Sequence, residues 1–124
     1  MNPLAWLAFL AAGAVGAPAR YLVDGLVADH VEGVFPWGTL VVNATGSLVL
    51  GLLTGFSLYH ALPSTPKVVL GTGFCGAYTT FSTFTFETVR LLEEGAINEA
   101  FRNSLGTLAV CAGAAAAGVA LAAL

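Results

Sequence analysis

Charge is what this sequence has least of. Only 9% of its 124 residues are charged, with four Lys and Arg against seven Asp and Glu, whereas soluble globular domains carry about 25%. Hydrophobic residues make up 57% of the chain, and the mean hydropathy is +0.86. This composition excludes an ordinary soluble domain and gives no reason to expect a nucleic-acid partner. It indicates a multi-pass membrane protein.

Cysteine and histidine are also scarce. Cys75 and Cys111 both fall inside apolar segments, where a small polarisable side chain is expected, and His30 and His60 lie far apart near segment ends. A disulfide framework or a histidine–cysteine metal site needs clustered ligands. We therefore expect neither, and we do not expect an enzyme.

Four stretches lack charge and are long enough to cross a bilayer at roughly 20 residues each. They run over 3–19 (continuing toward 23), within 35–62, over 68–86 and over 103–124. Short connections near 25–34, 61–66 and 93–101 leave no room for a soluble domain. Residues 1–124 are thus expected to form one all-α domain of four transmembrane helices. A cleaved signal peptide is the alternative for the first stretch, but no Lys or Arg precedes it and three more spans follow.

The third stretch is unusual for a membrane span. From Gly73 to Glu87 it carries glycines, hydroxyl side chains and several phenylalanines. Helix propensity is poor where glycine and β-branched threonine crowd one turn, and polar groups in hydrocarbon need partners. We therefore expect a helix broken near its middle that lines a polar path.

The charges give weak orientation signals. If the chain weaves through the membrane, the N-terminus, the 61–66 connection and the C-terminus share one side, with Lys67. All seven acidic residues and three arginines then lie toward the other side. Because the positive-inside rule counts Lys and Arg and largely ignores acids, both orientations in the membrane are expected.

A stripe of small and polar residues recurs at helical spacing in the second stretch, through Thr39, Asn43, Ser47 and Gly51. Close helix packing explains the small residues. Asn43 favours a pore lining, because an amide stranded in lipid is costly, although an interhelical hydrogen bond is also possible. The fourth stretch has a similar stripe through Asn103 or Ser104, Thr107 and Cys111.

Two ionisable residues near the span ends leave alternatives open. Arg20 precedes Asp24 by four residues, so it can form a local ion pair or serve as a cation that attracts anions into a vestibule. Glu87 ends the third stretch and is expected to be interfacial or a dimer contact rather than a proton carrier.

At these residues the chain resembles the small fluoride channels of the CrcB or Fluc family. The similar motifs are Gly16-Ala17-Pro18-Ala19-Arg20-Tyr21, the run from Pro36 to Gly46, and the third-span signature Gly73-Phe74-Cys75-Gly76 followed by Thr79 to Phe84 and Glu87. The third is the most specific. Ala77 departs from the pattern, since the family usually has a second glycine there.

The resemblance implies a fluoride-selective channel that passively exports fluoride across the cell (plasma or inner) membrane and so reduces its toxicity. It implies an antiparallel, dual-topology homodimer with two pores, and a structural sodium ion held by the backbone carbonyls of Gly76 and Thr79. Gly76→Val is expected to fail because the side chain would block both the backbone conformation and the close approach at this site. The implied vestibule residue is Arg20, and the implied fluoride-pore residues are Asn43, Phe81, Phe84, Ser82, Thr83, Ser104 and Thr107.

Two other functions remain as alternatives. A proton-coupled small multidrug exporter is also built of four helices, but it needs a carboxylate deep in the membrane, and the first span has none before Asp24. A non-transporting scaffold leaves Asn43 and the polar third span unexplained.

Overall fold

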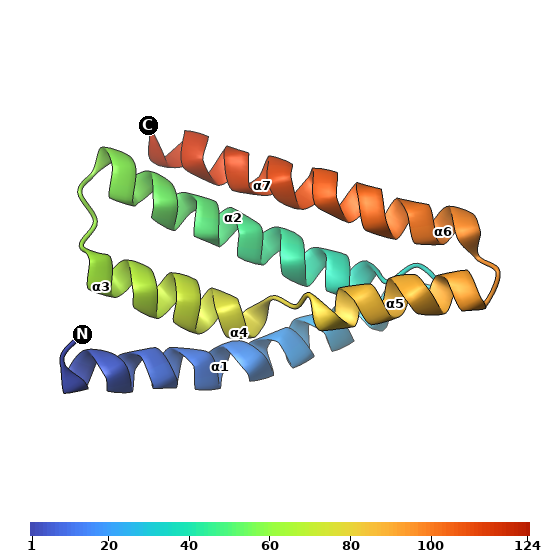
Figure 1. Ribbon diagram of the computed structural model, residues 1–124, viewed down its shortest axis with the longest axis horizontal. Coiled ribbons are helices and arrows are strands. Elements are labelled where there is room, and N and C mark those ends of the chain that lie inside the picture. The colour runs from blue at the N-terminus through green and yellow to red at the C-terminus, as the bar shows by residue number, and fades with distance from the viewer.

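The structure, a computed structural model, describes residues 1–124 and is entirely helical (Figure 1). The elements are α1 (Pro3–Ala28), α2 (Trp37–Tyr59), α3 (Ser64–Lys67), the π-helical stretch η1 (Val68–Cys75), α4 (Gly76–Tyr78), α5 (Ser82–Glu93), α6 (Ile97–Phe101), the π-helical stretch η2 (Arg102–Gly106) and α7 (Thr107–Ala122).

Three helical segments are long and apolar enough to cross a membrane: Pro3–Ala28, Trp37–Tyr59 and Ile97–Ala122. The third segment consists of α3, η1, α4 and α5, and an extended strip of chain interrupts it between α4 and α5 (Figure 1). The predicted break in the third segment is therefore confirmed. The two termini and the α2–α3 connection lie at one end of the molecule, as the sequence predicts for a weaving chain.

The helix bounds differ from the sequence prediction at two places. The last rod, which is formed by α6, η2 and α7 in succession, begins at Ile97 rather than near residue 103. Gly95, at φ +80°, turns the chain directly after α5, and a Glu99–Arg102 ion pair of 3.1 Å supports charged residues in the first turns of the next helix. Likewise, α1 continues past Arg20 to Ala28.

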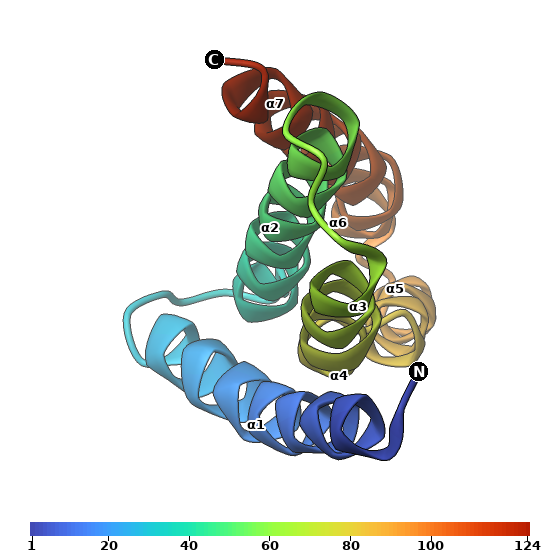
Figure 2. The ribbon, with the colours of Figure 1, turned by 90° about the vertical axis from the view of Figure 1, so that its left-hand side faces the viewer.

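Small residues allow the helices to pack closely. A Cβ atom added to Gly51 of α2 would lie 2.2 Å from the Ala115 carbonyl oxygen of α7, and one added to Gly118 would lie 2.4 Å from the Leu48 oxygen. These distances are too short for any side chain, so backbone meets backbone along the α2–α7 pair. Figure 2, viewed along the rods, shows α1 and α7 far apart, with α2 and the broken third segment between them.

The outer surface is apolar. Leu4, Leu7 and Leu10 on α1, and Leu105 and Leu108 near the start of the last rod, are all more than 60% exposed. Apolar surface on this scale suits a lipid surround rather than water. The chain is a multi-pass membrane protein.

Candidate functional site

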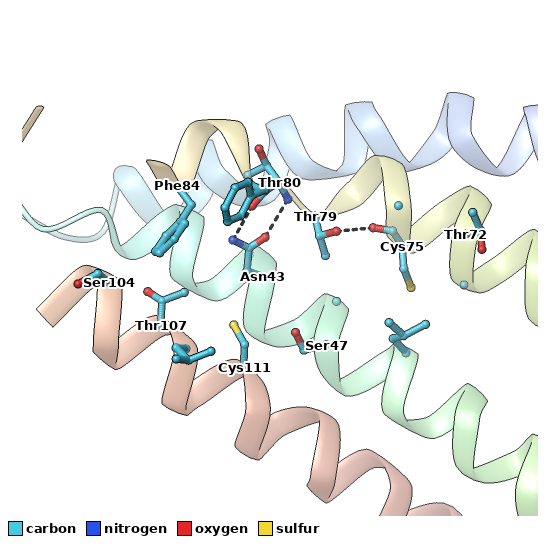
Figure 3. Close-up of a pocket in the computed structure, with 16 residues that line it drawn as sticks. Asn43, Ser47, Thr72, Cys75, Thr79, Thr80, Phe84, Ser104, Thr107 and Cys111 are labelled. Atoms are coloured by element: carbon cyan, nitrogen blue, oxygen red, sulfur yellow. Dashed lines mark hydrogen bonds between the residues drawn. The ribbon is translucent and has the colours of Figure 1, made fainter. Parts of the chain in front are cut away.

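The break in the third segment is held open by a side chain from α2. Thr79 has an extended backbone at ψ 166°, so the regular helical hydrogen bonds stop there. The Asn43 amide takes their place: Asn43 Nδ2 donates to the Thr80 carbonyl oxygen at 2.9 Å, and Thr80 N–H donates to Asn43 Oδ1 at 2.8 Å. Figure 3 draws this pair of bonds. Asn43 is 9% exposed, and its second amide hydrogen has no protein acceptor in the structure.

Further side chains occupy the backbone groups on either side of the break. The Thr83 N–H at the start of α5 donates to the Thr80 hydroxyl oxygen at 3.2 Å. The Thr79 carbonyl oxygen therefore lacks its helical donor, and it accepts instead from Arg20 Nη1 at 3.2 Å. The Gly76 carbonyl oxygen receives no backbone N–H, because Thr80 N–H is already bound to Asn43. The break thus leaves the Gly76 carbonyl oxygen without a hydrogen-bond donor and the Thr79 carbonyl oxygen bound only to Arg20.

A cavity of about 690 Å³ lies beside the break, between α2, the third segment and the last rod (Figure 3). Many of the lining residues are glycines or carry a hydroxyl or amide group, but apolar atoms form most of the lining surface, including two phenylalanines. The lining residues are Asn43, Gly46, Ser47, Leu50, Gly71, Thr72, Cys75, Gly76, Thr79, Thr80, Phe81, Phe84, Ser104, Thr107, Leu108 and Cys111.

The cavity brings together most of the residues that the sequence analysis named. Five of the seven predicted pore residues line it, namely Asn43, Phe81, Phe84, Ser104 and Thr107, and so do Gly76 and Thr79. Thr83 lines a different, smaller cavity of about 190 Å³, together with Arg20, Asp24 and Thr39. Ser82 is exposed and lines neither cavity.

The two phenylalanines of the cavity lie side by side. The ring centroids of Phe81 and Phe84 are 6.0 Å apart, and the ring planes are tilted by 41°. Phe81 is 75% exposed within the single chain. Phe86 is also exposed but does not line the cavity, so the three-residue spacing separates Phe81 and Phe84 from Phe86 as predicted.

The structure excludes a local ion pair for Arg20 and corrects the reason expected for a glycine at position 76. Arg20 forms no ion pair with Asp24; the two ion pairs are Arg90–Glu94 and Arg102–Glu99. Gly76 has an ordinary helical backbone at φ −62°, and a Cβ atom there would meet nothing within 4 Å. The expectation that a side chain blocks the backbone conformation at this position is wrong, because any residue adopts that φ.

Other polar contacts were not predicted. The Thr39 hydroxyl donates to Glu87 Oε1, joining α2 to α5. Asn103 is fully buried and bonds to Thr88 and Thr107. The only sequence signal for these contacts is a polar residue inside an apolar helix. That signal does not name the partner.

A family model described as "CrcB-like protein, Camphor Resistance (CrcB)" matches residues 7–119. The chain belongs to the CrcB family.

Curated members of the family are similar over most of their length. One is the "Fluoride-specific ion channel FluC 1" of Streptomyces avermitilis, 49% identical over 114 residues, or 92% of each chain. The protein of the same name from Frankia casuarinae is 48% identical, covering 94% of this chain and 95% of its own. The "Fluoride-specific ion channel FluC" of Methanocaldococcus jannaschii is 46% identical, covering 80% of this chain and 78% of its own. These CrcB relatives are named as ion channels and not as enzymes.

Proposed function

We propose that this CrcB protein is a fluoride-selective channel that lets fluoride leave the cell passively across the cytoplasmic membrane. The observation that carries the proposal is the cavity at the helix break, where the Asn43 amide, the Ser104 and Thr107 hydroxyls and the Phe81–Phe84 pair meet. A dehydrated anion needs preorganised donors to replace its water shell. The names of the CrcB relatives supply the identity of the anion.

The chemistry of the cavity suits a small anion. The Asn43 amide is fixed by its two bonds to Thr80, and it has a second N–H to offer. Aromatic rings are positive at their edges, so Phe81 and Phe84 attract an anion that passes edge-on. Neither kind of contact is strong enough to trap the ion, and conduction requires release as much as binding.

Export needs no pump. With the cell interior negative, moving one anion outward yields about 2.3 kcal/mol per 100 mV of membrane potential. A cell that accumulates fluoride as its neutral acid would be protected by such a leak.

The channel is proposed to be an antiparallel dimer of four-span subunits, with two pores. Phe81 lines the cavity and is largely exposed in the single subunit. A second copy packed across the break would cover this ring and complete each pore. The weak orientation bias of the basic residues favours insertion both ways, which an antiparallel pair needs.

A sodium ion is proposed at the centre of this dimer. The break deprives the carbonyl oxygens of Gly76 and Thr79 of their helical N–H donors. The Thr79 oxygen accepts one bond from Arg20, so a sodium ion would use its second lone pair. Carbonyl oxygens are the ligands that hard cations prefer, and interrupted membrane helices use them in this way. One subunit supplies two such oxygens, so a second copy would complete a set of four. The ion would stabilise the pairing of the two breaks.

The test is fluoride efflux from liposomes that contain the purified protein, read with a fluoride-selective electrode. The proposal predicts rapid efflux once a potassium ionophore removes the charge imbalance, and no comparable chloride efflux. Efflux only with a proton gradient would favour an exporter instead. Liposomes that retain their fluoride would refute the proposal.

A further inference from the structure

Two residues of the cavity wall, on different helices, are connected by hydrogen bonds through residues that do not line the cavity. Thr107 lies on the last rod and Phe84 on α5, and both face the cavity in Figure 3. Behind them a chain of side chains runs from one rod to the other, through Asn103 and Thr88. Neither connecting residue lines the cavity.

The direction of every hydrogen bond in this chain follows from counting hydrogens. The Thr88 hydroxyl donates its one hydrogen to the Phe84 carbonyl oxygen at 2.9 Å. It can therefore only accept from Asn103, which donates from Nδ2 at 2.8 Å. This fixes the Asn103 amide with Oδ1 toward Thr107, whose hydroxyl donates to it at 3.3 Å.

Asn103 is well placed to hold such a chain. It is 0% exposed, the lowest value among the buried polar residues. It lies in the π-helical stretch η2, and π-helical turns within membrane or soluble helices are frequent at functional sites. Because the amide is out of contact with water, its hydrogen bonds are made only to protein groups.

We propose that Asn103 and Thr88 are positioning residues for ion passage, which set the Thr107 hydroxyl and the α5 backbone at Phe84 at a fixed separation across the cavity. In the absence of an ion the Thr107 hydroxyl donates its one hydrogen to Asn103. This bond is long at 3.3 Å, so the hydroxyl can exchange it for a bond to a passing anion. The α5 end of the chain fixes the backbone that presents the Phe84 ring. The inference rests on the proposed fluoride function.

The experiment compares fluoride efflux, per folded protein, for Asn103→Leu, Thr88→Val, the double variant and Thr88→Ser. The matched control is Thr85→Val on the same helix, because the Thr85 hydroxyl bonds only to Phe81 and Ser82 carbonyls of its own helix. Initial rates over a range of internal fluoride concentrations give the maximal flux and the half-saturating concentration for each variant.

We expect Thr88→Val and Asn103→Leu each to lower the maximal flux roughly tenfold and to raise the half-saturating concentration, since both cut the same chain. The double variant should be no worse than the single ones. Thr88→Ser keeps the hydroxyl and should behave like the parent, as should Thr85→Val.

Two results would overturn the inference while leaving the channel function intact: Thr88→Val conducting like the parent, or losses in the two single variants that multiply in the double one. A fall in folded yield with unchanged flux and half-saturation would also overturn it, because that is a stability role alone. If Asn103→Leu fails to fold, the Thr88→Val and Thr88→Ser pair still decides. A parent protein that releases no fluoride would instead refute the proposed function itself.

Discussion

The Asn43 side chain and the Thr80 backbone form a closed pair, with the amide oxygen accepting from Thr80 N–H and the amide nitrogen donating to the Thr80 carbonyl. In this way a side chain on α2 provides hydrogen-bond partners for the Thr80 N–H and C=O at the break. An unpaired backbone group in a membrane costs several kcal/mol. Of the two sequence alternatives for Asn43, the structure confirms the interhelical hydrogen bond. The side chain also lines the cavity, and its role in a pore stays a prediction.

Replacing Asn43 tests both roles. Asn43→Asp removes the donor to the Thr80 carbonyl and puts a negative charge beside the anion path, so fluoride efflux should fall to the background rate. Asn43→Leu removes the donor without adding charge and should also abolish efflux, which separates lost donation from repulsion. Thr54→Val is the control on the same helix, because the Thr54 hydroxyl bonds only to Leu50 of its own helix. Normal flux from correctly folded Asn43→Asp protein would contradict the assignment.

The phenylalanine pair is tested by substitutions that keep bulk but remove the ring. Phe81→Ile and Phe84→Ile should each lower fluoride flux at least tenfold, because the positive ring edge is lost. Methionine should be tolerated better, since its thioether is polarisable. Phe86→Ile is the control, because Phe86 does not line the cavity. The ring-edge mechanism fails if Phe86→Ile is the damaging change and the other two conduct normally.

The hydroxyl residues are sorted by their location. Ser104→Ala and Thr107→Val should slow fluoride efflux a few-fold without loss of folded protein, because neighbouring donors or water compensate in part. Thr83→Val changes the smaller cavity that Arg20 also lines. Ser82→Ala changes an exposed position, which the proposed second subunit would cover. Electrode measurements on all four variants decide whether these hydroxyls lie along the fluoride path. Unchanged flux in every variant would place the path elsewhere.

Arg20 is predicted to attract fluoride as well as to bind the Thr79 carbonyl. Arg20→Gln should lower the flux several-fold at low ionic strength. The difference in flux between Arg20→Gln and the parent should shrink as salt is added, because salt screens the attraction that Arg20 exerts in the parent. Arg20→Lys keeps the charge and should lie between the two. A difference that stays the same at every ionic strength would mean that Arg20 acts through the Thr79 contact alone.

Membrane orientation is tested with a cysteine added at the C-terminus of a Cys75→Ala, Cys111→Ala background, so that only the tag reacts. If both orientations are made, an impermeant thiol reagent should label about half of the tags from outside intact cells and the rest only after the membrane is opened. Labelling from one side only would exclude an antiparallel homodimer.

Much of the fold could be predicted because it depends on local composition. Long uncharged runs predict spans, and the crowding of glycine, threonine and phenylalanine predicts a break near the middle of the third segment, which the structure places after Tyr78. Helix ends were less predictable. The last rod begins at Ile97, because a turn at Gly95 and an ion pair between Glu99 and Arg102 extend it beyond its apolar part.

The partners of polar side chains could not be predicted. Arg20 and Asp24 have the spacing of an ion pair, yet Arg20 bonds to Thr79, 59 residues away in the sequence. Only the tertiary packing of α1 against the break places the guanidinium beside a carbonyl without a helical donor. In the same way, no pattern in the sequence pairs Asn103 with Thr88, because the two residues meet across separate helices.

The central claim is passive, selective fluoride conduction, and the reversal potential in a planar bilayer tests it most directly. With equal chloride and pH on both sides and a tenfold fluoride gradient, the current should reverse at about 59 mV, the Nernst value for one univalent ion. A change in pH or chloride on one side should leave that value unchanged. A reversal potential near zero, or one that follows the proton or chloride gradient, would contradict the account.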